Sequence, residues 1–273
     1  MTYPKFTHTL KSHFSFYFSK DLRIFLSAIV ATLSISNSMF AQHSLAALKK
    51  ETPSVTFTEN KGPVHDQDSK PRKDILYAGN SKGMVFHLRN NGISYQLNRI
   101  DSYKANKDLK TGVVKDIADT STTYRLDVNW LSTNPLFSCT TEGRIPGAAN
   151  YFSDAYSDGI YNIKTYKGIT YQNIYKNIDL HYYEKNGDLK YDFIVAPNTD
   201  YKKIRMEIKG AEKIEIQQDG SLFISTPLGT TQEGKPIVFQ NGKQIKASWT
   251  IQENILSFDI QSYDGNSSQT DPT

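Results

Sequence analysis

The sequence has one cysteine, no long hydrophobic run and little net charge, and each shortage excludes a class of protein. Cys139 is the single cysteine, so no intrachain disulfide can form. The longest apolar run, residues 24–33, is too short for a comfortable transmembrane helix, which takes roughly 20 residues. No G-x-S-x-G, Walker or G-x-G-x-x-G motif is present, so the usual signatures of serine hydrolases and nucleotide-binding proteins are missing.

The first 41 residues have the three parts of a secretory signal peptide. Lys20 and Arg23 precede the apolar run, and Ala41 offers a small residue at a cleavage point. An uncleaved anchor helix is the alternative, because a long segment precedes the run. We predict an exported chain, placed outside the cell, at its surface or in the periplasm. The signal peptide covers 1–41, and a polar linker follows at 42–54.

Removal of the signal peptide leaves a nearly neutral chain. Four of the 32 basic residues and one of the 28 acidic residues lie in 1–41, so 28 basic and 27 acidic residues remain, a net charge of +1. A nucleic-acid partner would need a clustered basic face, and none is predicted. No membrane span is predicted after cleavage.

The rest of the chain is patterned as short strands and tight turns. In residues 174–195, apolar and polar residues alternate on both sides of Asn186-Gly187, a pair that suits a type I′ hairpin turn. No helical periodicity lasts beyond about two turns. The pattern predicts an all-β antiparallel sandwich over 55–262, with a polar tail at 263–273. Further turn signals are Asn91-Gly92, Asp219-Gly220 and Asn241-Gly242.

Two stretches are predicted to be irregular. Residues 101–122 are rich in Lys, Asp, Ser and Thr, which is typical of a mobile surface excursion. Residues 140–159 contain three glycines and a proline, which predicts a loop. That loop would divide the domain into two packed lobes, 55–139 and 150–262.

Several short motifs, in order along the chain, resemble those of one family. They are F-x-x-N-x-G at 57–62, N-Y-F at 150–152, a tyrosine-bounded strand at 171–175, I-D-L at 178–180, L-x-Y-D-F-x-V-x-P at 189–197, and D-G-x-L at 219–222 followed by Pro236 and Gln240. Together they resemble the uncharacterised β-rich N-terminal domain of bacterial, Bacteroidetes-type cell-surface proteins. In those proteins the domain precedes beta-propeller (SBBP) repeats or gliding-motility and type IX sorting domains.

The resemblance has departures. The family's Y-P-G-I-D-L reads Y-K-N-I-D-L at 175–180, and its closing L-x-I-D-P is reduced to Q-T-D-P at 269–272. No propeller repeat or sorting domain follows in this sequence. The resemblance therefore implies either a stand-alone exported module or a truncated fragment of a propeller-repeat surface protein.

Carboxylates near the central hairpin are the first candidates for chemistry. Asp179 and Asp192 are possible cross-strand neighbours, and glycosidases use two carboxyl groups a few ångströms apart. A solvated strand face would give the same pattern. Cys139 would need an adjacent histidine to act as a nucleophile, and no known signature surrounds it. Catalytic residues, metal ligands and cofactors are therefore predicted to be absent.

Loop aspartates and strand tyrosines are candidates for binding. Asp154, Asp158 and Asp200 suit either calcium or plain turn formation. Exposed tyrosines give contact area at low entropic cost, so a binding face is predicted. Its residues are Tyr151, Tyr156, Tyr161 and Tyr166.

Three functions follow from these patterns. We expect a non-enzymatic exported β-sandwich that takes part in adhesion or envelope organisation, with an extracellular protein or polysaccharide as partner. The first alternative is a secreted polysaccharide hydrolase that uses Asp179 and Asp192. The second is the truncated fragment.

Overall fold

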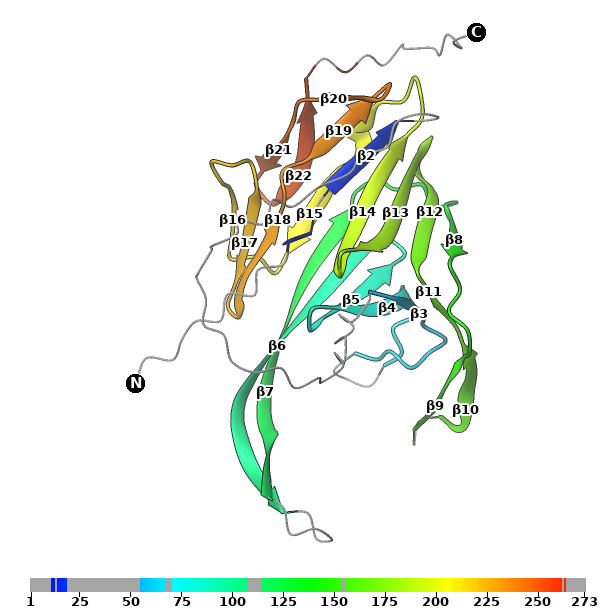
Figure 1. The fold of residues 1–273 in the computed structure, drawn as a ribbon, viewed down its shortest axis with the longest axis vertical. Helices are drawn as coiled ribbons and strands as arrows, with labels where there is room; N and C mark the ends of the chain where they lie inside the picture. The colour runs from blue at the N-terminus through cyan, green and yellow to red at the C-terminus, as the bar shows by residue number, and fades with distance from the viewer. Residues whose placement is uncertain are drawn as a thin grey trace, which may run out of the picture.

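The 273-residue chain forms an all-β protein in a computed structural model (Figure 1). The structure describes residues 55–66, 70–107, 114–153, 156–261 and 263, except the side chains of residues 107, 115 and 153. It also describes the backbone, but not the side chains, of residues 11–12 and 14–18. The predicted β-sandwich is confirmed. The predicted signal peptide, linker and C-terminal tail lie outside the described residues, apart from the two short N-terminal segments and Tyr263.

Helix is almost absent from the described part of the chain. The one helical segment there is the 3-10 turn η1 (Tyr201–Lys203), which Asp200 caps by accepting a hydrogen bond from the Lys202 amide. Among these residues, none forms a helix long and apolar enough to cross a membrane.

The larger layer is a nine-stranded sheet in which every neighbouring pair is antiparallel. In order across the sheet, its strands are β11 (Thr165–Tyr166), β3 (Phe57–Glu59), β4 (Ile75–Ser81), β5 (Met84–Arg89), β6 (Gly92–Lys107), β7 (Val114–Trp130), β15 (Met206–Lys209), β22 (Ile255–Ile260) and β21 (Ala247–Gln252).

The second layer is a seven-stranded sheet that contains the predicted hairpin. In order, its strands are β20 (Lys243–Ile245), β19 (Ile237–Gln240), β2 (Phe14–Phe18), β14 (Asp188–Val195), β13 (Ile178–Lys185), β12 (Gly168–Tyr175) and β8 (Ser138–Glu142). Asn186 and Gly187 have φ values of 57° and 78°, which suit the predicted tight turn between β13 and β14.

Two smaller sheets complete the described strands. One joins β1 (Lys11–Ser12), β18 (Gly229–Glu233), β17 (Leu222–Thr226) and β16 (Lys213–Ile216). The other is the hairpin of β9 (Ala149–Ser153) and β10 (Tyr156–Ile163), which Figure 1 places at one end of the molecule.

Aromatic side chains from the two large sheets fill the core. Alternate residues of β13 are buried, as the pleat of a strand requires, whereas β14 is buried on both faces, including the predicted solvent positions Lys190 and Asp192. Trp130 from the nine-stranded sheet packs on Tyr171 of the seven-stranded sheet at a ring distance of 5.0 Å. Phe193 and Phe258 meet in the same way at 6.4 Å. These contacts hold the two layers together.

The prediction of an irregular 101–122 was wrong. Most of that stretch belongs to β6 and β7, whose ladder continues beyond the sandwich as a two-stranded arm (Figure 1). Its polar residues pair across the strands: the Ser102 and Thr120 hydroxyls lie 2.7 Å apart, and Thr122 donates to Asp101 at 2.5 Å. The polar composition arises because both faces of the arm meet water.

Residues 140–159 also differ from the prediction. They include the end of β8, all of β9 and the start of β10. The two expected lobes do not form separate sheets, because β7 from the first half pairs with β15 from the second half, and β3 pairs with β11.

Candidate functional site

The side chain of Asn60 makes four hydrogen bonds within the loop between β3 and β4. Its amide nitrogen donates to the carbonyl oxygens of Arg72 and Ile75, each at 3.0 Å. Its amide oxygen accepts from the backbone N–H groups of Gly62 at 3.0 Å and Val64 at 3.3 Å. Gly62 has a φ of 124°, which other residues rarely adopt. Asn60 thus ties both ends of the loop to one point.

This loop forms one wall of a polar hollow on the nine-stranded sheet. The floor comes from β5, β6 and β7, at positions that alternate with core residues such as Tyr95. The hollow measures about 670 Å³, within the size range of small-molecule sites. Its lining residues are Val64, His65, Asp66, Arg72, Ile75, His87, Ser94, Gln96, Thr123 and Arg125.

Two arginine–aspartate pairs set the electrostatics of the hollow. Arg72 contacts both carboxylate oxygens of Asp74 at 2.7 Å, and this hydrogen bonding lowers the pKa of Asp74. Arg125 donates to Asp127 at 2.7 and 3.0 Å, and the Ser94 hydroxyl donates to the same carboxylate at 2.6 Å. Each pair uses two of five guanidinium N–H groups, so both arginines keep donors for a ligand.

His87 lies on the floor of the hollow as a neutral imidazole. Its pKa is lowered, mainly by burial and then by the charges of Arg72 and Arg125. A neutral ring offers one donor and one acceptor nitrogen. The hollow therefore presents both kinds of hydrogen-bonding group near neutral pH.

The lowered pKa of His87 predicts a loss of stability in mild acid. The unfolded chain binds a proton at His87 near pH 6.5, whereas the folded protein binds it only at lower pH. The contribution of neutral His87 to the free energy of unfolding is thus present above about pH 6.5 and is lost as the pH falls through the folded-state pKa. The free energy of unfolding, measured in urea, should fall less between pH 8 and pH 5 for His87→Gln than for the wild type. Parallel declines would contradict the prediction.

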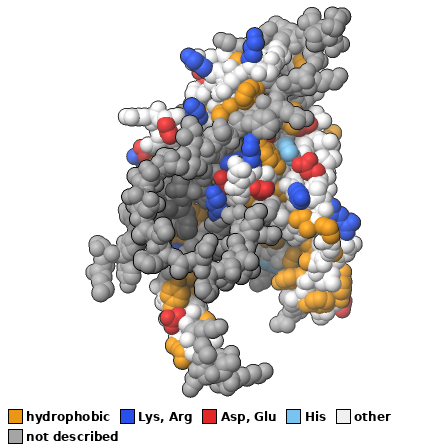
Figure 2. All heavy atoms as spheres, in the orientation of Figure 1, with side chains coloured by type: hydrophobic (Ala, Val, Ile, Leu, Met, Phe, Trp, Pro, Cys, Tyr) orange, Lys and Arg blue, Asp and Glu red, His pale blue; other side chains and the backbone are white. Residues whose placement is uncertain are grey.

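An aromatic hairpin stands beside the hollow. The hydroxyl of Tyr156, on β10, donates to the Gly62 carbonyl at 2.7 Å and lies 3.0 Å from the His65 ring. Tyr151, Phe152 and Tyr161 are 38%, 59% and 55% exposed. Figure 2 shows hydrophobic side chains gathered over β9 and β10. The β9–β10 hairpin therefore joins an exposed aromatic surface to the wall of the hollow.

The four tyrosines predicted as a binding face occupy three environments. Tyr151 and Tyr161 are exposed on the hairpin, and Tyr156 ties the hairpin to the loop. Tyr166 differs because it is only 8% exposed. Its hydroxyl donates to Glu59 of β3 at 3.0 Å, so Tyr166 is a buried structural contact next to the β3–β4 loop. Phe152 completes the exposed surface, with its ring 5.4 Å from that of Tyr161.

The two carboxylates considered for hydrolysis do not line this hollow. The register pairs Asp192 with His181 and Asp179 with Ile194, so the aspartates are diagonal neighbours on one face of the sheet. Asp179 accepts a hydrogen bond from the Asn173 amide at 2.6 Å, which braces the turn between β12 and β13. Asp192 is 1% exposed. This placement favours structural roles for both.

Cys139 is partly buried, and two of the three loop aspartates, Asp158 and Asp200, lie in the described part of the chain. Burial raises the pKa of the Cys139 thiol to about 12, which keeps it protonated and unreactive. Asp200 is the cap of η1, and Asp158 is exposed on β10. Asp154 lies outside the described residues. Within the described part of the chain, no group of three or more His, Cys, Asp and Glu side chains is arranged to hold a metal ion.

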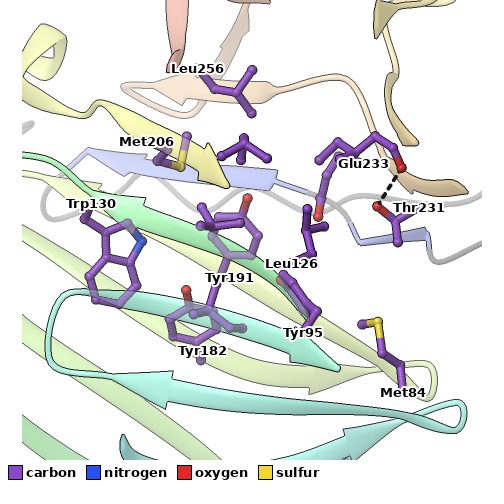
Figure 3. A pocket seen from close by; sticks show the side chains of 14 residues that line it. Met84, Tyr95, Leu126, Trp130, Tyr182, Tyr191, Met206, Thr231, Glu233 and Leu256 are labelled. Carbon is purple, nitrogen blue, oxygen red and sulfur yellow. Dashed lines mark hydrogen bonds between the residues drawn. The ribbon is translucent and has the colours of Figure 1, made fainter. Parts of the chain in front are cut away.

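A second cavity lies inside the sandwich, between the two large sheets (Figure 3). Its wall is mainly apolar and includes Met84, Tyr95, Trp130 and Tyr182, with Glu233 at one side. It measures about 30 Å³, room for about one water molecule. The cavity is part of the core packing and is too small for a substrate.

Comparison with known proteins gives one match. The model of a family described as a domain of unknown function, DUF7948, matches residues 57–271, most of the chain. No curated protein and no solved structure matches the sequence.

Proposed function

Because the chain belongs to the DUF7948 family, whose description names no activity, we propose a function from the geometry of the site. Residues 55–262 act as a non-enzymatic, exported binding module of a surface or secreted protein. The ligand is a polysaccharide, and the role is adhesion or envelope organisation. The observation that carries the proposal is the polar hollow joined to the exposed β9–β10 hairpin.

The chemistry of the hollow suits a sugar chain. Sugar hydroxyls both donate and accept hydrogen bonds, and the hollow offers donors from Arg72 and Arg125 and both kinds of group from His87 and Gln96. Sugar rings also have an apolar face, which packs on exposed aromatic rings. Such rings are exposed on the β9–β10 hairpin, which Tyr156 ties to the loop that walls the hollow.

The state of Asp74 does not suit this carboxyl group to hydrolysis. A glycosidase needs one carboxyl group that holds a proton near the working pH. The carboxylate of Asp74 is held by Arg72, and its pKa is lowered rather than raised. The Asp74 carboxylate therefore stabilises Arg72 and does not serve as a proton donor.

Substitution of Phe152 tests the proposal. We expect the wild-type protein to bind one or more members of a panel of neutral and acidic polysaccharides, measured by affinity electrophoresis and calorimetry. Phe152→Ala should weaken that binding about 3- to 10-fold, the contribution of one aromatic contact. Leu136→Ala removes an even more exposed apolar side chain from the β7–β8 loop and should bind as the wild type does.

Two results would contradict the proposal. One is a failure of the folded wild-type protein to bind any member of the panel. The other is equal binding by the Phe152 and Leu136 variants, which would remove the β9–β10 hairpin from the site.

A further inference from the structure

The seven-stranded sheet contains one strand that runs parallel to its neighbours. β2 lies between β14 and β19 and is parallel to both, as Figure 1 shows in blue. Its register aligns residues 14–18 with 191–195 of β14, and Ser15 and Phe16 with Ile237 and Val238 of β19. The other described pairs in this sheet are antiparallel. We call the space between β14 and β19 the strand slot.

The strand in the slot comes from the segment that export would remove. Residues 14–18 lie within the predicted signal peptide, 1–41. β14 pairs with β13 along its other edge, and β19 pairs with β20. After cleavage, the backbone groups of β14 and β19 that face β2 would lose their partners. Unpaired edges of this kind are costly when buried and bind other strands when open.

The side chains of the slot define what fits there. Tyr191, Phe193 and Val195 of β14 are 7%, 0% and 0% exposed and belong to the core, as does Val238 of β19. Asp192 alternates with them on the opposite face of β14. A strand that fills the slot must therefore place apolar side chains at three alternate positions, in register with these core residues, and tolerate polar ones between them.

We propose that the strand slot is a binding site for an extended segment of a partner chain. The segment runs parallel to β14, spans about five residues and alternates apolar with polar side chains, and it hydrogen-bonds to β14 and β19 at once. This inference rests on the proposed export and on removal of residues 1–41.

A partner peptide fits the slot better than a second copy of this chain. In the described part of the molecule beyond residue 54, every strand already belongs to a sheet. To supply one of these strands, a second copy would have to break that strand's own hydrogen bonds. An extended segment of a different protein has no such cost.

The test uses the full chain with a protease site placed within residues 42–54, folded first and cut afterwards. The probe is a fluorescent peptide with the sequence of residues 11–18. We expect the cut protein to take up the peptide and to melt at a higher temperature with it, and the uncut protein to take up none. A Phe16→Pro peptide should bind at least 10-fold more weakly, because proline removes an N–H group needed inside a sheet.

Several outcomes would overturn the inference. One is a cut protein that loses residues 1–41 and still takes up no peptide. Another is a dimer of the cut protein that peptide does not dissociate, which would assign the slot to a second copy. N-terminal sequencing of the exported protein tests separately whether residues 1–41 are removed in the cell. If the exported protein keeps residues 1–41, the proposed removal in the cell is wrong, whatever the cut protein binds.

Discussion

Replacing Tyr171 by alanine is expected to lower the free energy of unfolding by about 3–5 kcal/mol, the usual cost of removing a large buried aromatic side chain. Tyr171 is 0% exposed and lies between the two large sheets. Its ring packs edge-on against Trp130 at 5.0 Å and Tyr182 at 6.2 Å. Its hydroxyl donates to the Arg89 carbonyl at 2.9 Å, so one side chain joins β12 to β5 and β7.

Tyr171→Phe separates the hydrogen bond from the packing. It keeps the ring but leaves the buried Arg89 carbonyl without this donor, which should cost about 1–3 kcal/mol. Tyr161→Ala, at an exposed ring, should change stability by roughly 0.5 kcal/mol or less. Guanidinium unfolding followed by tryptophan fluorescence measures all three variants. Equal costs for the two alanine variants would show that Tyr171 does not bridge the layers.

Local patterns in the sequence predict the β13–β14 hairpin because all its determinants are close together. The alternation in residues 174–195 indicates two strands, and Asn186-Gly187 supplies the turn, although the polar positions Lys190 and Asp192 are buried too. The same reasoning predicts strands elsewhere and the all-β class. It cannot predict which strands become neighbours: β7 pairs with β15 at a separation of about 80 residues, and no local signal encodes that choice.

The polar arm shows a second limit of pattern reading. A strand is recognised when one face is apolar, since period-two alternation then appears. β6 and β7 beyond the sandwich have water on both faces, so their sequence has the composition of a flexible loop. Their pairing is held by the backbone ladder and by cross-strand contacts such as Lys104–Asp119 at 2.8 Å.

The candidate site was only partly predictable. Exposed Tyr151 and Tyr161 follow from the aromatic content of one segment. The hollow does not, because His65, His87 and Arg125 come from separate segments that only the sheet register brings together. One trace of it is present in the sequence. The motif at 57–62 contains Asn60, whose role becomes visible only when its partners, the loop residues up to position 75, are placed around it.

Asn60→Ala is expected to remove ligand binding, with a loss of at least 10-fold, and to lower the free energy of unfolding by about 2–3 kcal/mol. The side chain makes four hydrogen bonds to the backbone of the 60–75 loop, and each contributes about 1 kcal/mol or less after solvation is counted. Without them the wall of the hollow has no common anchor. Asn60→Asp keeps the acceptor for Gly62 and Val64 but loses both donors. Its affinity and its free energy of unfolding should therefore lie between those of the wild type and of Asn60→Ala.

Asn134→Ala separates the loss of the site from a loss of stability. Asn134 holds the β7–β8 loop in a similar way: it donates to the Asn173 carbonyl at 3.1 Å and accepts from the Leu136 amide at 3.0 Å. Its removal should cost about 1–2 kcal/mol and leave polysaccharide binding unchanged, because the hollow is built from other residues. Titration calorimetry at a temperature where all variants are folded gives the affinities, and guanidinium unfolding gives the free energies of unfolding. If Asn60→Ala binds as well as Asn134→Ala does, the loop that Asn60 anchors is not a wall of the binding site.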